Sequence, residues 1–212
     1  MVDVFDKIAD AMASLDSDGF KKALNEAMEK KTPVTDILEK GLRKGLAEVG
    51  RRFEAGEYFL SELLFGADMM GEAMKTLSPQ LKEQSIEKKG TIVLGTVRGD
   101  IHDIGKNIFK AFAQGSGFEV FDLGVDVDPE NFVRNVVEKK PNVLGLSALL
   151  TTTISEMKIV IDELKKARAR DQVKVILGGN AVTEEYAKEI GADAAAVDAV
   201  QGTNFCKGWI RK

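Results

Sequence analysis

The chain has 212 residues, of which 44% are hydrophobic and 30% charged, and its formal net charge is −4. This composition indicates a folded globular protein, with enough residues for one large domain or two small ones. The mild acidity and the lack of a long basic run argue against nucleic acid and anionic membranes as partners. No membrane span and no signal peptide is predicted, and Cys206 has no second cysteine to pair with, so we expect a cytoplasmic protein.

Apolar residues recur at steps of three and four through the first part of the chain, which is the spacing of one face of an α-helix. This pattern predicts helices over 4–15, 20–29, 38–53 and 60–77. Asp16 or Ser17 is a suitable N-cap for the second helix, and Pro33 suits the start of the third. Four amphipathic helices with short connections predict a small helical bundle over residues 1–88.

A polar stretch over residues 78–90 follows the last of these helices. Ser78-Pro79 opens it, and the residue before a proline is disfavoured in helical conformation, so we predict that the helix ends there. We expect this stretch to be a linker or a loosely packed connection between a domain at 1–88 and a domain at 89–212.

Short apolar runs that alternate with helical patterns fill the second part of the chain. The predicted strands are 91–97, 118–124, 142–149, 173–179 and 194–197, and the predicted helices are 104–114, 129–139, 153–168, 183–190 and 201–210. This alternation predicts a doubly wound, Rossmann-like or flavodoxin-like parallel sheet of five strands in the order 2-1-3-4-5. Ligands of such sheets bind beyond the carboxyl ends of the strands, near the first and third strands.

The loop after the first predicted strand, RGDIHDIGKN over residues 98–107, holds the only histidine of the chain, His102. Two phosphate-binding motifs do not fit this loop. Gly99 and Gly105 are one residue too far apart for a P-loop, and no G-x-G-x-x-G fingerprint is present.

A carboxylate, Asp100, lies two residues before His102, and carboxylate–histidine–metal is a recurring arrangement in metalloproteins. One histidine cannot make a zinc or iron site by itself, and no other cluster of metal ligands occurs in the sequence. A metal with one protein ligand needs a macrocycle to fill its other positions. A lone histidine at a strand end is also often a cap or a hydrogen-bonded surface residue, so the loop alone leaves both interpretations open.

Three motifs in the sheet domain, Asp100-x-His102-x-x-Gly105, Ser147-x-Leu149 and Gly178-Gly179, resemble the signature of cobalamin-binding domains in order and separation. The resemblance implies that His102 replaces the cofactor's own benzimidazole on cobalt, the base-off/His-on form. It also implies that the freed nucleotide tail enters a slot between strands and helices.

The resemblance further implies roles for individual residues of this chain. Asp100, His102 and Ser147 would form a network that controls the axial ligand, with His102 as the metal ligand. Thr151 would bond near the tail. The remaining contacts to the cofactor would come from Gly99, Ile101, Asp103, Ile104, Gly105, Leu149, Gly178, Gly179 and Ala199. The stretch 191–196 departs from the family pattern, which often has bulkier residues there.

Residues 54–74 resemble the helical cap of methionine synthase and of the small methanol and methylamine corrinoid proteins of methyltransferase systems. By position, Phe53, Leu60 and Leu63 would shield the methyl face of the corrin, and Glu39 would make a polar contact to the cofactor. Apolar residues at helical spacing are also typical of an ordinary bundle core, and this alternative stays open.

The resemblance implies a carrier of methyl groups on cobalamin. A donor-specific methyltransferase would methylate Co(I), and a second methyltransferase would pass the methyl group from methyl-Co(III), methylcobalamin, to an acceptor such as tetrahydrofolate or a thiol. A reductive activase is a further implied partner. Because no catalytic acid, base or nucleophile stands out, we expect a cofactor-carrying subunit that does not catalyse alone.

The alternatives are a B12-based sensor, the small subunit of an adenosylcobalamin mutase and a flavodoxin-like module without a corrin.

Overall fold

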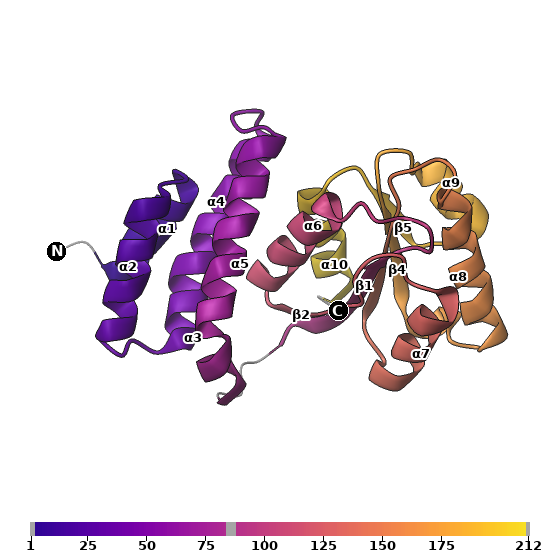
Figure 1. Cartoon of the computed structure of the whole chain (residues 1–212), viewed down its shortest axis with the longest axis horizontal. Coiled ribbons are helices and arrows are strands. Elements are labelled where there is room, and N and C mark those ends of the chain that lie inside the picture. Colours follow the sequence, from indigo (N-terminus) through magenta and orange to yellow (C-terminus); the bar gives the residue numbers. More distant parts are fainter. Residues whose placement is uncertain (1–2, 84–87, 211–212) are drawn as a thin grey trace. The chain divides into compact units, whose positions relative to one another are not determined.

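The computed structural model describes residues 3–83 and 88–210 and divides the chain into two compact units, Met1–Glu87 and Lys88–Lys212. The first unit is helical, and the second is a parallel sheet covered by helices on both faces (Figure 1). The predicted fold class, a helical bundle followed by a doubly wound sheet of five strands, is confirmed.

The helical unit follows the apolar periodicity of its sequence. Its helices are α1 (Val4–Ala13), α2 (Ser17–Glu29), α3 (Val34–Asp36), a π-helical segment (Ile37–Leu42), α4 (Arg43–Glu54) and α5 (Leu60–Glu83). The predicted N-cap Asp16 accepts a hydrogen bond from the backbone N–H of Gly19 at 3.0 Å, and α3 begins directly after Pro33. The predicted helix over 38–53 is therefore part of a longer helical stretch that includes a π-helical turn.

The helix end predicted at Ser78-Pro79 is wrong, because α5 continues through Pro79 to Glu83. Proline lacks a backbone N–H and so withdraws one intrahelical hydrogen bond, that to the carbonyl of Lys75. Pro79 is exposed and lies in the last turns of the helix, where water can satisfy this carbonyl. Residues 84–87 of the predicted linker lie outside the described residues.

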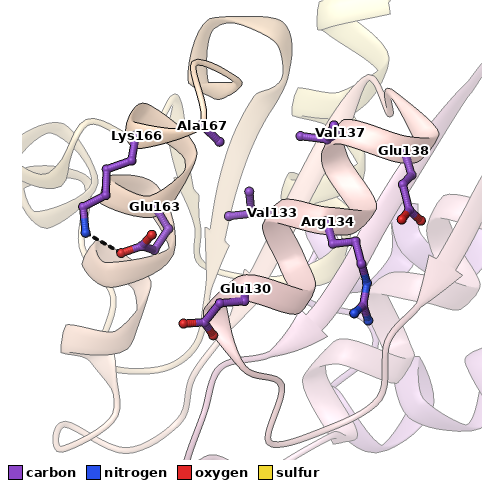
Figure 2. A pocket seen from close by; sticks show the side chains of 8 residues that line it. All are labelled: Glu130, Val133, Arg134, Val137, Glu138, Glu163, Lys166 and Ala167. Carbon is purple, nitrogen blue, oxygen red and sulfur yellow. Dashed lines mark hydrogen bonds and ion pairs between the residues drawn. The ribbon is translucent and has the colours of Figure 1, made fainter.

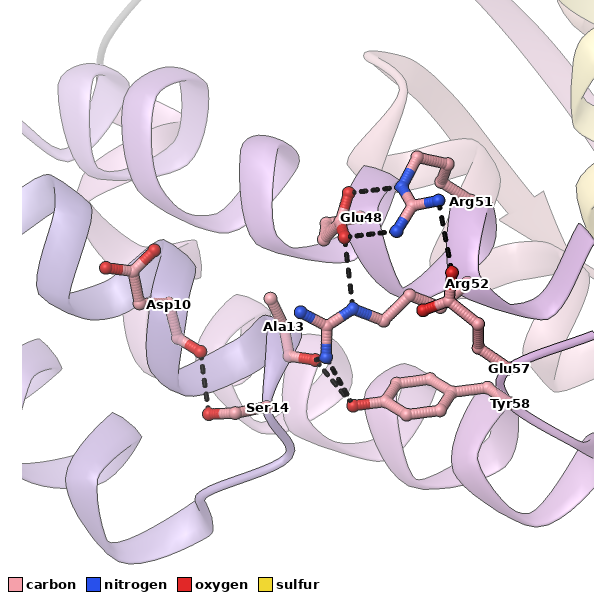
Figure 3. A network of polar contacts seen from close by, with 8 residues as sticks. All are labelled: Asp10, Ala13, Ser14, Glu48, Arg51, Arg52, Glu57 and Tyr58. Carbon is pink, nitrogen blue, oxygen red and sulfur yellow. Dashed lines mark hydrogen bonds and ion pairs between the residues drawn. The ribbon is translucent and has the colours of Figure 1, made fainter. Parts of the chain in front are cut away.

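A polar network joins α1, α4 and the loop between α4 and α5 (Figure 3). Arg52 donates hydrogen bonds to the Ala13 carbonyl at 3.0 Å and to the Tyr58 hydroxyl at 2.8 Å. The Tyr58 hydroxyl in turn donates to the Ala13 carbonyl at 2.8 Å. Glu48 accepts from both Arg51 and Arg52, at 2.8 to 3.0 Å. The network therefore ties the loop before α5 to the end of α1.

The strands of the second unit run parallel in the order β2-β1-β3-β4-β5, which confirms the predicted order. They are β1 (Gly90–Thr96), β2 (Phe118–Asp122), β3 (Val143–Ser147), β4 (Lys174–Gly178) and β5 (Ala194–Ala196). The helices are α6 (Ile104–Gly115), α7 (Pro129–Lys139), α8 (Ile154–Lys166), α9 (Glu184–Ile190) and α10 (Ala199–Ile210), with a 3-10 turn at Arg170–Gln172.

Both faces of the sheet are buried, which explains why its strands read as continuous apolar runs. Ile92 and Leu94 of β1 point into a core that includes Cys206 of α10. Val93, between them, points to the opposite face and belongs to a core with Phe132 of α7 and residues of α8. Helices α6 and α10 cover the first face, and α7 and α8 cover the second (Figure 1).

The strand order reverses between β1 and β3, so the loops after these strands leave the same edge of the sheet. In the register of the sheet, Thr96 lies beside Ser147, and Ser147 lies beside Gly178. The ends of β1, β3 and β4 are therefore neighbours, and the three sequence motifs that follow them meet at this carboxyl edge.

Candidate functional site

Asp100 is the most heavily bonded side chain of the carboxyl edge, and it is fully buried. Its Oδ1 atom accepts hydrogen bonds from the backbone N–H of His102 at 3.0 Å and from Nδ1 of the His102 ring at 2.9 Å. Its Oδ2 atom accepts from the Thr153 hydroxyl at 2.7 Å and from the backbone N–H groups of Leu149 and Leu150 at 2.8 and 3.2 Å. One carboxylate thus joins the loop after β1 to the loop after β3.

These hydrogen bonds keep Asp100 ionised. Burial by itself would raise the pKa of Asp100. The hydrogen bonds from the His102 backbone, the Thr153 hydroxyl and the His102 ring outweigh burial and hold the pKa well below its usual range. An ionised carboxylate can only accept, so the Nδ1 atom that faces it carries the hydrogen. In a neutral ring the lone pair therefore lies on Nε2, and the His102 side chain is 44% exposed.

The hydroxyl that bonds Asp100 is that of Thr153, whereas the expected part of Ser147 in this network stays a prediction. Among the described residues, no hydrogen bond joins the Ser147 side chain to Asp100. Thr153 is the N-cap of α8 and is buried, and its hydroxyl makes no cap bond to its own helix. The run of threonines before the predicted helix was a signal for it, because threonine is a favoured N-cap. The exposed Thr151 is two residues earlier.

Two glycines of the edge have backbone conformations that require glycine. Gly179 has a φ of 135°, and an added Cβ there would lie 1.8 Å from the Ala148 carbonyl oxygen. Gly99 has a φ of 80°. By contrast, a Cβ added at Gly105 or Gly178 would meet nothing within 4 Å, so the space beside the start of α6 and the end of β4 is open.

The predicted contact residues around His102 form a rim with exposed apolar side chains. Ile101, Ile104 and Leu149, in the loop after β1, at the start of α6 and in the loop after β3, are all exposed large apolar side chains. Asp103, the N-cap of α6, accepts a hydrogen bond from the Asn107 side chain at 2.9 Å. Ala199 is the first residue of α10, after β5. The rim is suited to a flat apolar ligand.

The donor set fits a metal that brings its own equatorial ligands. In residues 3–83 and 88–210, no group of three or more histidine, cysteine or acidic side chains could hold a metal ion. His102 offers one exposed nitrogen, with a buried carboxylate behind it and an apolar surface around it. This arrangement, together with the open space at Gly105 and Gly178, fits a corrin ring and its tail.

The four predicted cap residues belong to the helical unit. Glu39 lies in the π-helical segment, is exposed and forms an ion pair with Arg43. Phe53 is half-buried at the end of α4, and Leu60 is 59% exposed at the start of α5. Leu63 is 1% exposed, so its side chain is packed in the interior, as the alternative of an ordinary core residue predicts.

A groove of about 360 Å³ lies between α7 and α8 (Figure 2). Val133, Val137 and Ala167 line it together with charged side chains, among them the ion pair of Lys166 and Glu163 at 2.6 Å. None of its lining residues belongs to the three motifs, so this groove does not mark the cofactor site.

The fold and the site together define a class. The chain is an α/β protein of the doubly wound type that presents one histidine nitrogen, supported by a buried carboxylate, at the carboxyl edge of its sheet. The B12 binding domain family matches residues 90–204, and a second B12 binding domain family matches residues 4–78. The chain belongs to the family of B12-binding corrinoid proteins, and the predicted cofactor class, cobalamin or a related corrinoid, is confirmed.

Relatives match over nearly the whole chain. The dimethylamine corrinoid protein of Methanosarcina barkeri is 41% identical over 206 residues, which cover 97% of this chain and 96% of the relative. The trimethylamine corrinoid protein of the same organism is 38% identical over 203 residues, covering 93% and 94%. A solved methanol:cobalamin methyltransferase complex from Methanosarcina barkeri contains a chain with 30% identity and a TM-score of 0.83, covering 98% of this chain and 79% of that one.

A solved cobalamin-binding protein from Desulfitobacterium hafniense is 38% identical, with a TM-score of 0.75 and coverage of 99% of both chains. No described helix of the present chain is both long and apolar enough to cross a membrane.

Proposed function

We propose that this chain is the corrinoid carrier of a methyltransferase system, which receives a methyl group from a donor-specific methyltransferase and presents it to a second one. The relatives named as methylamine corrinoid proteins support this proposal, as does the similar chain in a methanol:cobalamin methyltransferase complex. The observation that carries the proposal is the hydrogen bond of 2.9 Å between His102 Nδ1 and the buried Asp100, which leaves the other ring nitrogen free to bind cobalt.

When bound, the corrinoid supplies a cobalt centre that accepts and releases a methyl group. The chain's own residues hold and orient this centre. Asp100 fixes the tautomer and the orientation of the His102 ring, and Thr153 and the backbone N–H groups of the β3–α8 loop fix Asp100. The His102 ring is therefore held in one orientation before the cofactor binds.

The remaining predicted residues have separate proposed roles at the cofactor. Gly105 and Gly178 border the open space that would take the nucleotide tail, with Ser147 and Thr151 as polar contacts to it. Their positions at the ends of β3 and β4 and at the start of α6 support these roles. In the helical unit, the exposed Leu60 is the best-placed of the predicted shielding residues because its side chain is available for contact.

The partners are proposed in the same way. The names of the relatives contain methylamines and methanol, and we propose that a compound of this class is the methyl donor, recognised by the partner methyltransferase. Tetrahydrofolate or a thiol is the proposed acceptor, and a reductive activase would restore inactive cofactor. Capture of a methyltransferase by the loaded protein, but not by the cofactor-free protein, would support this arrangement.

The ligand role of His102 is tested with hydroxocobalamin and the full chain. The wild-type protein is expected to show the spectrum of cobalamin with a lower nitrogen ligand, which the protein supplies, whereas His102→Ala is expected to show a base-off spectrum. His102→Ala should lose that nitrogen and bind the cofactor at least tenfold more weakly, since losing support around a metal usually costs about 10- to 100-fold in affinity. Added imidazole should restore the wild-type spectrum of His102→Ala.

The matched control is Arg98→Ala. Arg98 is in the same loop, and its ion pair with Glu156 at 2.9 Å is partly exposed. This variant should keep the wild-type spectrum and affinity. A His102→Ala spectrum identical to that of the wild-type protein would contradict the proposed ligand.

A further inference from the structure

The loop that carries His102 is also held from the side of β2, by Asp126. The Asp126 carboxylate accepts a hydrogen bond from the backbone N–H of Gly99 at 2.6 Å. The Asp126 backbone N–H donates to the Asp100 carbonyl at 3.0 Å and to the Thr96 hydroxyl at 2.9 Å. The buried Thr96 hydroxyl donates to the same carbonyl at 2.5 Å. Asp126 therefore bonds Gly99 and Asp100, the residue directly before the Asp-x-His motif and the first residue of that motif.

The backbone of Asp126 is in an unusual conformation. Its φ is 52°, in the left-handed region, which costs free energy for a residue other than glycine. Aspartate and asparagine tolerate this region better than other side chains. Gly99, its hydrogen-bond partner, also has a positive φ of 80°. Two neighbouring residues with positive φ persist where surrounding hydrogen bonds hold their backbone conformation. Here those hydrogen bonds involve the peptide groups around Asp100.

We infer that Asp126 is a positioning residue for the metal ligand, an inference that rests on the proposed function of His102. The Asp126 carboxylate holds the Gly99 N–H, and its backbone N–H holds the Asp100 carbonyl, while the β3–α8 loop fixes the Asp100 carboxylate. The sequence offered no sign of this role, because Asp126 lies outside the three motifs and is 24 residues after His102 along the chain, by their numbers.

The test compares two substitutions that separate the hydrogen bond from the backbone strain. Asp126→Gly keeps the positive φ without strain but removes the acceptor for Gly99. Asp126→Asn keeps a side-chain oxygen that can accept this hydrogen bond and also tolerates the left-handed region. Asp128→Asn removes one negative charge two residues away, from a side chain without a cap bond, and is the matched control.

The measurements are the visible spectrum and the dissociation constant of each full-length protein with hydroxocobalamin. Asp126→Gly is expected to bind about tenfold more weakly and to shift toward the spectrum without a protein nitrogen. Asp126→Asn and Asp128→Asn should match the wild-type protein. An Asp126→Gly protein with the wild-type spectrum and affinity, or an Asp126→Asn protein as defective as Asp126→Gly, would overturn the inference.

Two further variants keep this test decisive. If Asp126→Gly does not fold, Thr96→Val removes the hydroxyl that accepts from the Asp126 N–H and donates to the Asp100 carbonyl, with little change in side-chain shape. It should shift the spectrum in the same direction, Thr96→Ser should restore it, and a wild-type spectrum for Thr96→Val would overturn the inference. His102→Ala separates the two hypotheses. If His102→Ala leaves the spectrum unchanged, the proposed function fails. If His102→Ala changes the spectrum but the Asp126 and Thr96 variants do not, only the inference about Asp126 fails.

Discussion

The two units of this protein use polar side chains in different ways. The buried polar side chains among the described residues are Thr96, Asp100, Lys106, Thr153 and Thr203, and all lie in the sheet unit. Ion pairs of the helical unit are mostly exposed, as in the network of Glu48, Arg51 and Arg52, where the side chains are 30 to 55% exposed (Figure 3). The exception among the described pairs is Arg43, which pairs with Glu39 and is 12% exposed, with a buried Nε that has no hydrogen-bond partner. Polar side chains at the surface stay solvated, so an ion pair there costs little free energy. A buried polar group loses its hydration and is destabilising unless it is hydrogen-bonded. Most of the buried polar groups of the sheet unit gather at the edge that holds His102, which indicates that this edge was shaped for a site and not only for stability.

The comparison is tested most strongly by Asp100→Ala. This substitution leaves the Thr153 hydroxyl and the buried N–H groups around it without their acceptor. The free energy of unfolding of the cofactor-free protein should fall by about 3 kcal/mol, since each unsatisfied buried donor costs about 1–3 kcal/mol. Urea unfolding followed by circular dichroism measures this change.

Asp103→Ala is the control for Asp100→Ala. Asp103 is in the same loop but is only half-buried, and it accepts one side-chain hydrogen bond, from Asn107. Its replacement should cost less than about 1 kcal/mol. Equal losses in the free energy of unfolding for the two variants would contradict the prediction that the buried Asp100 contributes more to stability than the half-buried Asp103.

A second large effect is expected at Lys106, the buried lysine at the start of α6. Its Nζ atom donates to both carboxylate oxygens of Asp122, at 2.8 Å each, and to the Asn107 side chain at 2.9 Å. Lys106→Met should cost about 2 kcal/mol, less than the loss of a fully buried pair because Lys110 still bonds Asp122. Lys110→Met, which removes the more exposed partner, should cost clearly less in the same unfolding experiment.

The pH dependence of stability is expected to arise partly from Asp193. Burial alone would raise the pKa of Asp193, but Lys174, the Val175 N–H and Arg170 lower it below its ordinary value. A carboxyl group whose pKa is lower in the folded state stabilises the protein above its unfolded-state pKa. This stabilisation is lost as the pH falls through the folded-state pKa.

Asp193→Asn should therefore reduce the free energy of unfolding by about 1.5 kcal/mol at pH 7, the lower end for hydrogen bonds to charged groups. The difference from the wild-type protein should shrink below about pH 4, near the ordinary pKa of an aspartate. Unfolding curves at several pH values check this, and a difference that stays constant down to the lowest pH at which the protein folds would contradict it.

The smallest effect is expected in the helical unit. Tyr58→Phe removes the hydroxyl that donates to the Ala13 carbonyl and accepts from Arg52. The expected cost is about 1 kcal/mol, the usual net value of a hydrogen bond. Glu48→Gln in the same network should change the melting temperature less than Tyr58→Phe does. A loss for Glu48→Gln or Tyr58→Phe as large as that for Asp100→Ala would show that the surface network stabilises as strongly as the buried one.

The sequence predicted the architecture well because both units have clear apolar periods. Continuous apolar runs predicted the five strands, and their order followed from the rules for doubly wound sheets. The end of α5 was predicted too early, at Ser78-Pro79. The residue before a proline usually ends a helix, but a proline in the last turns of a helix removes only one hydrogen bond, and α5 continues to Glu83.

The site was predicted in part. The Asp-x-His spacing predicted the contact between Asp100 and His102, because residues two apart in a loop can meet. The partners of Asp100 from other loops could not be read in the same way. Thr153 and Asp126 are far from Asp100 in sequence, and which hydroxyl or N–H reaches its atoms depends on loop conformation. For the same reason helical spacing could not distinguish the exposed Leu60 from the buried Leu63.

Because His102 is the only histidine, isotope labelling tests the proposed cobalt bond directly. The protein is produced with ¹⁵N-histidine, loaded with hydroxocobalamin and reduced by one electron to paramagnetic cobalt for electron paramagnetic resonance. The account predicts that nitrogen splitting changes from triplets in the unlabelled protein to doublets in the labelled one. Triplets that persist after labelling would come from the cofactor's own base and would contradict ligation by His102, as would the absence of any nitrogen splitting.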